Sequence, residues 1–352
     1  MGVLERYAAV LPLTAATPRL SLQEGDTPLI PAPRLAAWLG VSAVHLKVEG
    51  ANPTGSFKDR GMVVAVAKAR EAGAGAVLCA STGNTAASAA AYAAHAGIDA
   101  VVLLPAGRVA AGKLAQAVMY GARVVSVRGS FDDALRVARA AADACDAVLV
   151  NSVNPYRIEG QATAAYEICA TLGDAPTLLA LPVGNGGNIT AYWLGFRRAL
   201  EQGLARRLPR ILGVQAAGAA PFVLGHPVAA PETIATAIRI GNPATWEPAL
   251  AAARDSGGAI RSVTDDEILA AYHAVARLSG VFCEPASAAG VAGLRNAVRD
   301  GAVAAATSCV CVLTGNGLKD PDTAVRGVRT DAPIEASLDA LVAALGWGGA
   351  EG

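Results

Sequence analysis

Residues 76–105 read AVLCASTGNTAASAAAYAAHAGIDAVVLLP, and this stretch decides the fold class. Two short apolar runs, AVLCAST (76–82) and DAVVLLP (99–105), have the length of buried strands and are bordered by turn-forming residues. The alanine-rich segment between them predicts a helix. A strand, a helix and a second strand in succession form a βαβ unit, which places the two strands parallel in one sheet.

The same alternation continues along the rest of the chain. Further strands are predicted at RVVSV (123–127), AVLV (147–150), LLALPV (178–183), RILGVQAA (210–217) and SCVCVLTG (308–315). Helices are predicted near 157–172 and 189–202, and after Thr264, which forms a capping box with Glu267. The pattern predicts an α/β protein with two open, mainly parallel-sheet domains that share a cleft. Ligands of such sheets bind beside the loops that follow the strands.

Composition excludes several classes of partner. The chain has 352 residues, with 29 basic and 29 acidic side chains, and 53% of its residues are apolar. Balanced charge provides no basic surface for nucleic acid or for an anionic membrane, and the apolar content argues against disorder. The longest charge-free stretch, 72–98, is interrupted by polar residues and glycines, unlike a membrane-spanning helix. With no export signal at the N-terminus, we expect a cytoplasmic protein.

The cysteines and histidines show no metal-binding spacing. The six cysteines are scattered without a C-x-x-C pair, and the four histidines are equally dispersed. Cys309 and Cys311 alternate along a predicted strand, which indicates two buried side chains on one face. Small core residues in a reducing compartment explain this use of cysteine. We therefore expect no metal site and no disulfide.

The segment EGANPTGSFKDRGM (49–62) contains the first candidate catalytic residue. Ser56 is a candidate N-cap for a helix starting near Phe57, which places Lys58 in the first helical turn. The helix dipole disfavours a cation there and lowers the pKa of an amine, as a Schiff-base lysine requires. A surface lysine paired with Asp59 is the alternative, and spacing alone leaves both interpretations open.

Three further loops follow predicted strands and precede helices or turns. The segment from Ser81 to Thr85 brings together hydroxyls, an amide and helix N-terminal N–H groups, which suits a carboxylate or a phenolate oxygen. The run Gly184, Asn185, Gly186, Gly187 and Asn188 can turn consecutive N–H groups toward a phosphate. Thr314 presents a hydroxyl at the end of the last strand. Each of these loops alone is also compatible with a plain turn or an ordinary helix N-terminus.

Taken together and in this order, the motifs resemble the threonine synthases, within the tryptophan-synthase-β-like (fold type II) group of pyridoxal-phosphate enzymes. The resemblance covers nearly the whole chain, from GDTPLI (25–30) to TGNGLKD (314–320). SFKDRG is shared across the group and indicates the cofactor, pyridoxal 5'-phosphate (PLP). NSVNPYRIEGQ (151–161) and IATAIRIGNP (234–243) are narrower and indicate a threonine synthase.

The resemblance implies roles for individual residues around the cofactor. Lys58 would form the Schiff base and move the protons, Asn84 would hydrogen-bond the phenolic oxygen, and Thr314 would meet the pyridine nitrogen. The loop from Gly184 to Asn188 would hold the cofactor phosphate. The substrate would contact two clusters, one at Ser81, Thr82 and Thr85, and one for its phosphate at Asn151, Ser152 and Arg157.

The implied reaction converts O-phospho-L-homoserine and water to L-threonine and phosphate by γ-elimination and β-addition. Alternatives are a serine/threonine dehydratase, another PLP-dependent elimination or replacement enzyme, and a non-catalytic PLP-binding protein. Ala162 stands where the family usually has lysine, so a cation near Arg157 is expected to be missing, which leaves room for an altered phosphorylated or phosphonate substrate.

The resemblance also implies an organisation for the chain. We expect a large PLP-binding domain formed by residues 1–52 and 150–325, and a small α/β domain formed by residues 53–149. Residues 326–352 would form a peripheral helical tail. A homodimer with a small-molecule substrate is expected.

Overall fold

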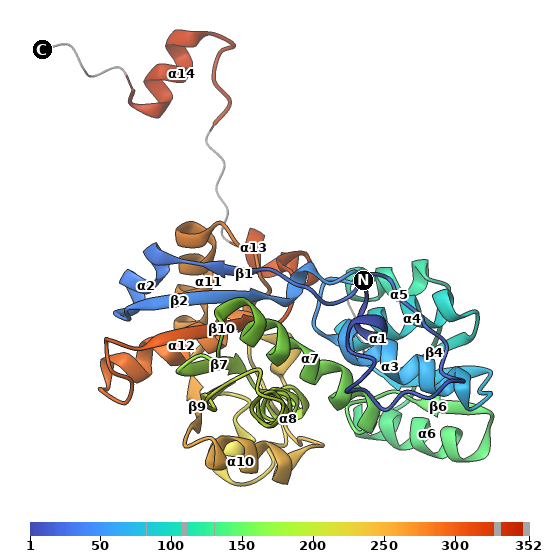
Figure 1. The fold of residues 1–352 in the computed structure, drawn as a ribbon. Helices are drawn as coiled ribbons and strands as arrows, with labels where there is room; N and C mark the ends of the chain where they lie inside the picture. Colours follow the sequence, from blue (N-terminus) through green and yellow to red (C-terminus); the bar gives the residue numbers. More distant parts are fainter. Residues whose placement is uncertain (82, 107–110, 130, 327–331, 348–352) are drawn as a thin grey trace, which may run out of the picture. The chain divides into compact units, whose positions relative to one another are not determined.

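The computed structural model describes residues 1–81, 83–106, 111–129, 131–326 and 332–347, so Thr82 lies outside the described residues. Its α/β architecture with mainly parallel strands confirms the predicted fold class (Figure 1). One sheet has six strands, in the order β1 (Leu29–Pro31), β2 (Ala43–Val48), β10 (Ser308–Leu313), β7 (Leu178–Pro182), β8 (Arg210–Ala216) and β9 (Ala259–Val263). A second sheet has four, in the order β5 (Arg123–Val127), β4 (Asp99–Pro105), β3 (Ala76–Ala80) and β6 (Ala147–Leu149).

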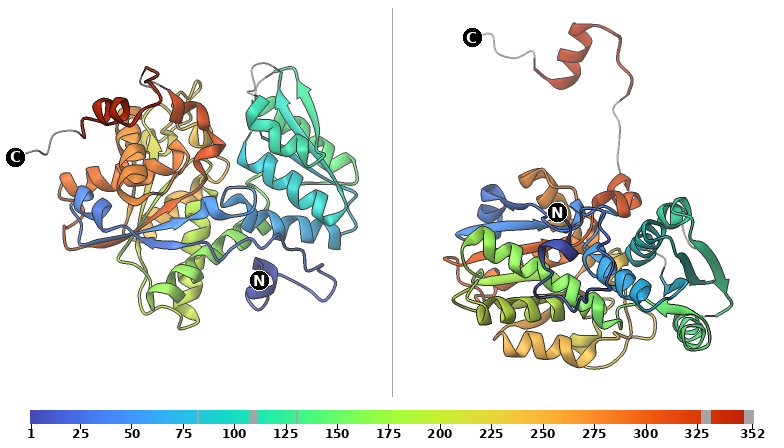
Figure 2. Two further views of the ribbon diagram at one scale, coloured as in Figure 1. Left: turned by 90° about the horizontal axis from the view of Figure 1, so that it is seen from above. Right: turned by 45° about the vertical axis from the view of Figure 1, so that its right-hand side comes forward.

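Most neighbouring strands are parallel, as expected for the βαβ units predicted from the sequence. Every pairing between these strands is parallel except the antiparallel pairing of β1 with β2, two strands that the sequence pattern did not reveal and that α2 connects. Figure 2 shows the four-stranded sheet, in cyan to green, lying beside the six-stranded one. Cys309 and Cys311 are fully buried in β10, as predicted, whereas Cys145 is exposed.

Helices cover both sheets. Those of the first half of the chain are α1 (Val3–Arg6), α2 (Pro33–Leu39), η1 (Glu49–Ala51), α3 (Lys58–Glu71), α4 (Asn84–Ala96), α5 (Ala111–Met119), α6 (Phe131–Ala144) and α7 (Pro155–Leu172). Those that follow are α8 (Gly187–Glu201), α9 (Pro221–Leu224), η2 (Thr236–Ile238), α10 (Trp246–Asp255), α11 (Asp265–Ser279), α12 (Pro285–Arg299) and η3 (Gly317–Lys319).

Local capping chemistry explains where the helices begin. The predicted capping box is confirmed, because Thr264 Oγ1 accepts from the Glu267 amide at 3.3 Å while Glu267 Oε2 accepts from the Thr264 amide at 2.8 Å. α7 begins at Pro155, two residues before the predicted start, because Asn154 caps it. α3 begins at Lys58, one residue after the predicted start; Phe57 makes no side-chain cap, and Ser56 Oγ accepts from the Lys58 amide at 3.4 Å, as a capping hydroxyl does.

Helices α3 and α7 cross at two glycines, each three residues after a predicted site residue, Lys58 or Arg157. A Cβ atom on Gly61 of α3 would lie 2.5 Å from the carbonyl oxygen of Arg157, and one on Gly160 of α7 would lie 2.0 Å from that of Arg60. Real Cβ atoms do not approach oxygen so closely, so α3 and α7 pack backbone against backbone here. The crossing places Lys58, at the start of α3, near Arg157, at the start of α7.

A buried network of four charged side chains reinforces this crossing. The Arg60 guanidinium lies 2.7 Å from carboxylate oxygens of both Glu49 and Glu167, and Lys47 Nζ lies 2.6 Å from Glu167. All four residues are at most 3% exposed, and two cations balance two anions. The network joins β2, η1, α3 and α7.

The C-terminal residues form a separate compact unit. The chain divides into Met1–Asp320 and Pro321–Gly352. The second unit contains α13 (Pro321–Val325) and α14 (Leu338–Leu345), and Ser337 caps α14 by accepting from the Ala340 amide at 3.2 Å. No helix within the described residues has the length and apolar character needed to cross a membrane.

Substitution of alanine for Gly160 tests the helix crossing. The added methyl must push α3 away from α7, so we expect a loss of about 1–3 kcal/mol in the free energy of unfolding. Denaturant unfolding followed by circular dichroism measures it. Gly97→Ala is the control, because its Cβ meets no atom within 4 Å and only the backbone conformation is strained. An equal or smaller loss for Gly160→Ala would contradict the close approach.

Candidate active site

The predicted motifs meet where strands of the two sheets end. Ser81 follows β3, Gly184 follows β7 and Thr314 follows β10. The loop before α3 is hydrogen-bonded to the segment after β10: the Phe57 amide donates to the Thr314 carbonyl at 3.0 Å, and the Asn316 amide donates to that of Gly55 at 2.9 Å. The motif containing Lys58 is therefore held against the end of the six-stranded sheet.

Lys58 lies at the first position of α3, with Nζ 4.4 Å from the centre of the Phe57 ring. Burial and, second, the charge of Arg157 lower the pKa of Lys58 to about 7, and Glu284 partly opposes this shift. The predicted neutral amine is thus supported. Its main causes are desolvation and a neighbouring cation, in place of the helix dipole that the sequence suggested.

The alternative interpretation of Lys58, an ion pair with Asp59, is wrong. The Asp59 carboxylate is buried and accepts from the Thr54 amide at 2.7 Å and from the hydroxyls of Thr54 and Ser88, each at 2.6 Å. Burial raises the pKa of Asp59 to about 6 despite these donors. No ion pair of Lys58 is found among the described residues.

A buried carboxylate connects the two residues predicted to flank the cofactor ring. Asn84 Nδ2 donates to both oxygens of Glu284, at 3.1 and 3.2 Å, and Thr314 Oγ1 lies 3.4 Å from one of them. Glu284 is 3% exposed, and burial raises its pKa. Sequence reasoning gave Glu284 no role. An acid directly before Pro285, a proline that can start a helix, was the available signal.

The glycine-rich loop after β7 forms a concave turn of backbone. Gly186 has φ = 85°, in the region that favours glycine, and its Cβ would lie 2.7 Å from the Thr245 carbonyl oxygen. α8 begins at Gly187, so its free N–H groups point out of the same turn. Asn188 Nδ2 is buried without a hydrogen-bond partner among the described residues. This geometry fits a phosphate bound by backbone and amide donors.

Arg157 is the most unusual residue of the site. Its side chain is 1% exposed, and one nitrogen, Nη1, donates to the Val150 carbonyl at 3.1 Å. Nε and Nη2 are buried without a partner in the part of the chain that the structure describes. Burial lowers the pKa of Arg157 to about 10, so the side chain remains charged at neutral pH. A buried guanidinium whose Nε and Nη2 are available as donors suits an anion.

The other residues predicted to contact the substrate differ in their hydrogen bonds and in how far they are buried. Ser81 and Thr85 are half-buried around the start of α4, and Ser81 Oγ accepts from the Gly83 amide at 3.2 Å. The Asn151 side chain both donates to the carbonyl and accepts from the amide of Ala80, at 2.9 Å each, so it fixes the end of β3 and retains one free N–H. Ser152 is half-buried.

Position 162 does not face Arg157. Ala162 is buried at the crossing of α7 with α8, and a Cβ on Gly195 would lie 2.3 Å from its carbonyl oxygen. Five residues along a helix correspond to a rotation of about 140° from Arg157. The expected loss of a cation beside Arg157 therefore finds no support in this packing.

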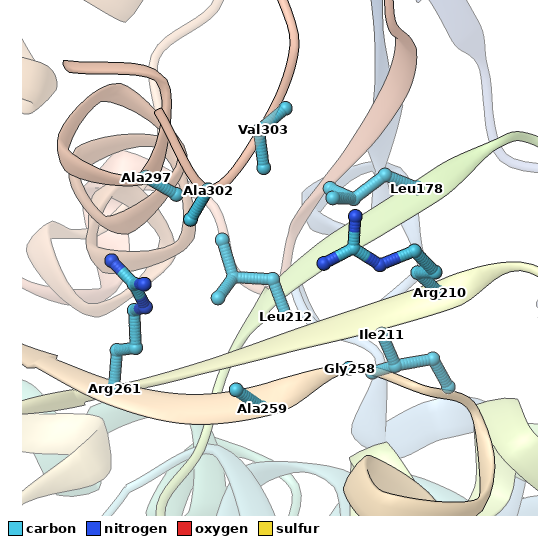
Figure 3. Close-up of a pocket in the computed structure, with 10 residues that line it drawn as sticks. All are labelled: Leu178, Arg210, Ile211, Leu212, Gly258, Ala259, Arg261, Ala297, Ala302 and Val303. Atoms are coloured by element: carbon cyan, nitrogen blue, oxygen red, sulfur yellow. The ribbon is translucent and has the colours of Figure 1, made fainter. Parts of the chain in front are cut away.

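A small pocket lies away from these loops. It has a volume of about 50 Å³ and lies among the first residues of β7, β8 and β9 (Figure 3). Parallel strands put their amino ends at the edge opposite the loops described above, and this volume admits only about one or two water molecules. Among the described residues no cluster of three potential metal ligands occurs.

Comparison with known proteins agrees with this site. The family model described as "Pyridoxal-phosphate dependent enzyme" matches residues 20–315. The chain is 58% identical to the threonine synthase of Mycobacterium leprae, covering 98% of this chain and 96% of that protein. It is 56% identical to that of Synechocystis sp., covering 98% and 91%.

Solved structures with the same fold include other enzymes. A threonine deaminase from T.th. superimposes with a TM-score of 0.68 at 26% identity, covering 94% of this chain and 97% of that one. Maize serine racemase superimposes with a TM-score of 0.72 at 24% identity, covering 83% and 88%, which supports the fold alone.

The lowered pKa of Lys58 predicts its reactivity. Because only a neutral amine attacks an electrophile, labelling of Lys58 by fluorodinitrobenzene in cofactor-free protein should rise with pH and level off above a midpoint near 7. Peptide mass spectrometry measures this rate. Arg157→Gln removes the neighbouring cation, so the midpoint should move upward. A midpoint near that of a free lysine peptide in both proteins would contradict the assignment.

Proposed function

Since the chain belongs to the pyridoxal-phosphate-dependent enzymes and, within them, to the threonine synthases, we propose that its site converts O-phospho-L-homoserine and water to L-threonine and phosphate. The protein is a PLP-dependent lyase. The identity of its substrate and the roles of its residues are our proposal, argued below from the contacts of the site.

The residues present fit PLP. The loop from Gly184 to Asn188 offers backbone N–H groups in a turn that a side chain at Gly186 would fill, together with the unpartnered Nδ2 of Asn188. Asn84 and Thr314 both contact Glu284 and would supply an amide and a hydroxyl to the cofactor ring. Lys58 supplies the amine that holds the cofactor.

Lys58 also moves the protons of the reaction. When bound, PLP supplies the electron sink for the negative charge left at the substrate α carbon. With a pKa of about 7, Lys58 Nζ is divided between its neutral and charged forms at neutral pH, so it both accepts and returns protons there. We assign to it removal of the α proton, participation in removal of a β proton, and reprotonation after water adds at the β carbon.

One observation carries the choice of a phosphorylated substrate: the buried Arg157 with Nε and Nη2 unpartnered among the described residues. A planar guanidinium binds a phosphate with two parallel hydrogen bonds. We place the substrate phosphate there, assisted by Ser152 and the remaining N–H of Asn151. The hydroxyls of Ser81 and Thr85, together with Thr82, would hold the substrate carboxylate. The phosphate leaves from the γ carbon into a site built for an anion.

We also propose how the molecule is organised. The four-stranded sheet belongs to a small domain formed by residues 53–149, and the six-stranded sheet belongs to a large domain formed by residues 1–52 and 150–325. Residues 326–352 form a peripheral tail. We further propose a cytoplasmic homodimer without nucleic-acid or membrane partners, and light scattering during gel filtration tests the dimer.

The reaction is tested by incubating the purified yellow protein with O-phospho-L-homoserine and measuring phosphate and threonine together. Equal amounts of both are expected. Phosphate with 2-oxobutyrate and no threonine would indicate a dehydratase-like elimination and would contradict the proposal. Lys58→Ala should lose turnover while its circular dichroism spectrum remains that of the wild type.

Arg157→Gln tests the substrate phosphate contact; because it also removes the cation that lowers the pKa of Lys58, its kinetics are compared with wild type at a pH where Lys58 is neutral in both proteins. Loss of charged hydrogen bonds to phosphate should lower kcat/KM for O-phospho-L-homoserine by about 10–100-fold. PLP binding, measured from the visible absorption band, should change far less. The dissociation constant of L-threonine, the unphosphorylated product, measured from the visible band, provides the comparison. An equal loss for L-threonine and for O-phospho-L-homoserine would argue against a phosphate contact at Arg157.

A further inference from the structure

We propose that Glu284 and Ser287, in the first turn of α12, are positioning residues that fix the directions in which Asn84 and Thr314 donate hydrogen bonds toward the cofactor ring. The inference rests on the proposed function. Neither residue was assigned a role from the sequence, and each acts through a neighbour in place of touching the reacting atoms.

The start of α12 is unusual because its polar side chains do not serve the helix. Glu284 is the N-cap, yet its carboxylate makes no capping hydrogen bond. It reaches instead to Asn84 Nδ2, at 3.1 and 3.2 Å. Gly315 makes room for it, since a Cβ there would lie 2.5 Å from the carboxyl carbon of Glu284. Two features therefore let the Glu284 carboxylate reach Asn84: it makes no capping hydrogen bond to α12, and position 315 has no side chain.

Glu284 determines how the Asn84 amide is turned. An ionised carboxylate only accepts hydrogen bonds, so the NH₂ group of Asn84 must face it and the amide cannot flip. Because one N–H can bridge both carboxylate oxygens, the other can donate to a phenolic oxygen. Burial raises the pKa of Glu284, whereas the hydrogen bond from Asn84 and the charges of Lys319 and Lys58 favour its charged form.

Ser287 determines the direction in which the Thr314 hydroxyl donates its hydrogen bond. Ser287 is fully buried, and its Oγ accepts from the Gly315 amide at 3.0 Å. Its own proton has two acceptors, Thr314 Oγ1 at 3.0 Å and the Gly315 carbonyl at 3.4 Å, and the shorter contact is the stronger one. When Thr314 accepts from Ser287, its single proton is free for an unprotonated ring nitrogen. The competing contact of Thr314 with Glu284, at 3.4 Å, is long and weak.

Double-mutant cycles test whether these residues act through their neighbours. The PLP dissociation constant is measured by absorbance titration of the full-length, PLP-stripped protein. Ser287→Ala should weaken PLP binding about tenfold in the wild-type background, and less than about twofold in a Thr314→Ala background. Glu284→Gln should behave in the same way toward Asn84→Ala, and should also shift the visible band of bound PLP.

Ser279→Ala is the matched control for Ser287→Ala. It also deletes a serine hydroxyl from a neighbouring helix, where the half-buried Ser279 Oγ donates to the Val275 carbonyl at 2.5 Å in α11. Its PLP dissociation constant should equal that of the wild type. If Ser287→Ala fails to fold, Ser287→Cys keeps a weak donor of similar shape and should show a smaller loss of the same sign.

Two results would overturn the proposal. Equal losses from Ser287→Ala with and without the Thr314 hydroxyl would show that Ser287 does not act through Thr314. A lower melting temperature of the stripped protein with an unchanged PLP dissociation constant would show a purely structural role. Failure of the wild type to form threonine would refute the proposed function, whereas the cycles measure cofactor affinity independently of turnover.

Discussion

The contact between two helix backbones at Gly61 and Gly160 is the constraint on which the site depends. Because neither glycine has a side chain, α3 and α7 approach until carbonyl oxygens occupy the space of a Cβ atom. This approach places Lys58 near Arg157. The buried Arg60, which bridges Glu49 and Glu167, holds the crossing with paired charges, and removing one member would leave an uncompensated ion in the core.

The electrostatics of the site follow from that crossing. Arg157 is desolvated and lacks an acidic partner among the described residues, so its charge lowers the pKa of Lys58 and is available to an anion. The 29 basic and 29 acidic side chains cancel over the whole chain. Phosphate recognition therefore depends on one buried cation and on oriented N–H groups, with no general positive surface to attract polyanions.

Much of the fold was predictable because its signals are local. Buried parallel strands such as β4 are continuous apolar runs between turn residues, and Thr264 with Glu267 predicts a helix start from four residues alone. The predictions failed where a long-range contact decided the outcome. The short antiparallel β1 depends on β2, and the partners of Asp59 come from a turn and from α4.

The sequence by itself determined the order of most strands and helices, the loops that carry the chemistry, and the family to which the chain belongs, because periodicity and motifs are properties of neighbouring residues. Only the tertiary structure decided that burial and the charge of Arg157 lower the pKa of Lys58. It also decided that the Asn151 side chain hydrogen-bonds to the backbone of Ala80, and that the backbone at position 162 packs against α8. It also brought Glu284 between Asn84 and Thr314, residues separated by 200 and 30 positions from it in the chain. Burial and charge partners depend on which distant segments meet, and no local pattern contains that information.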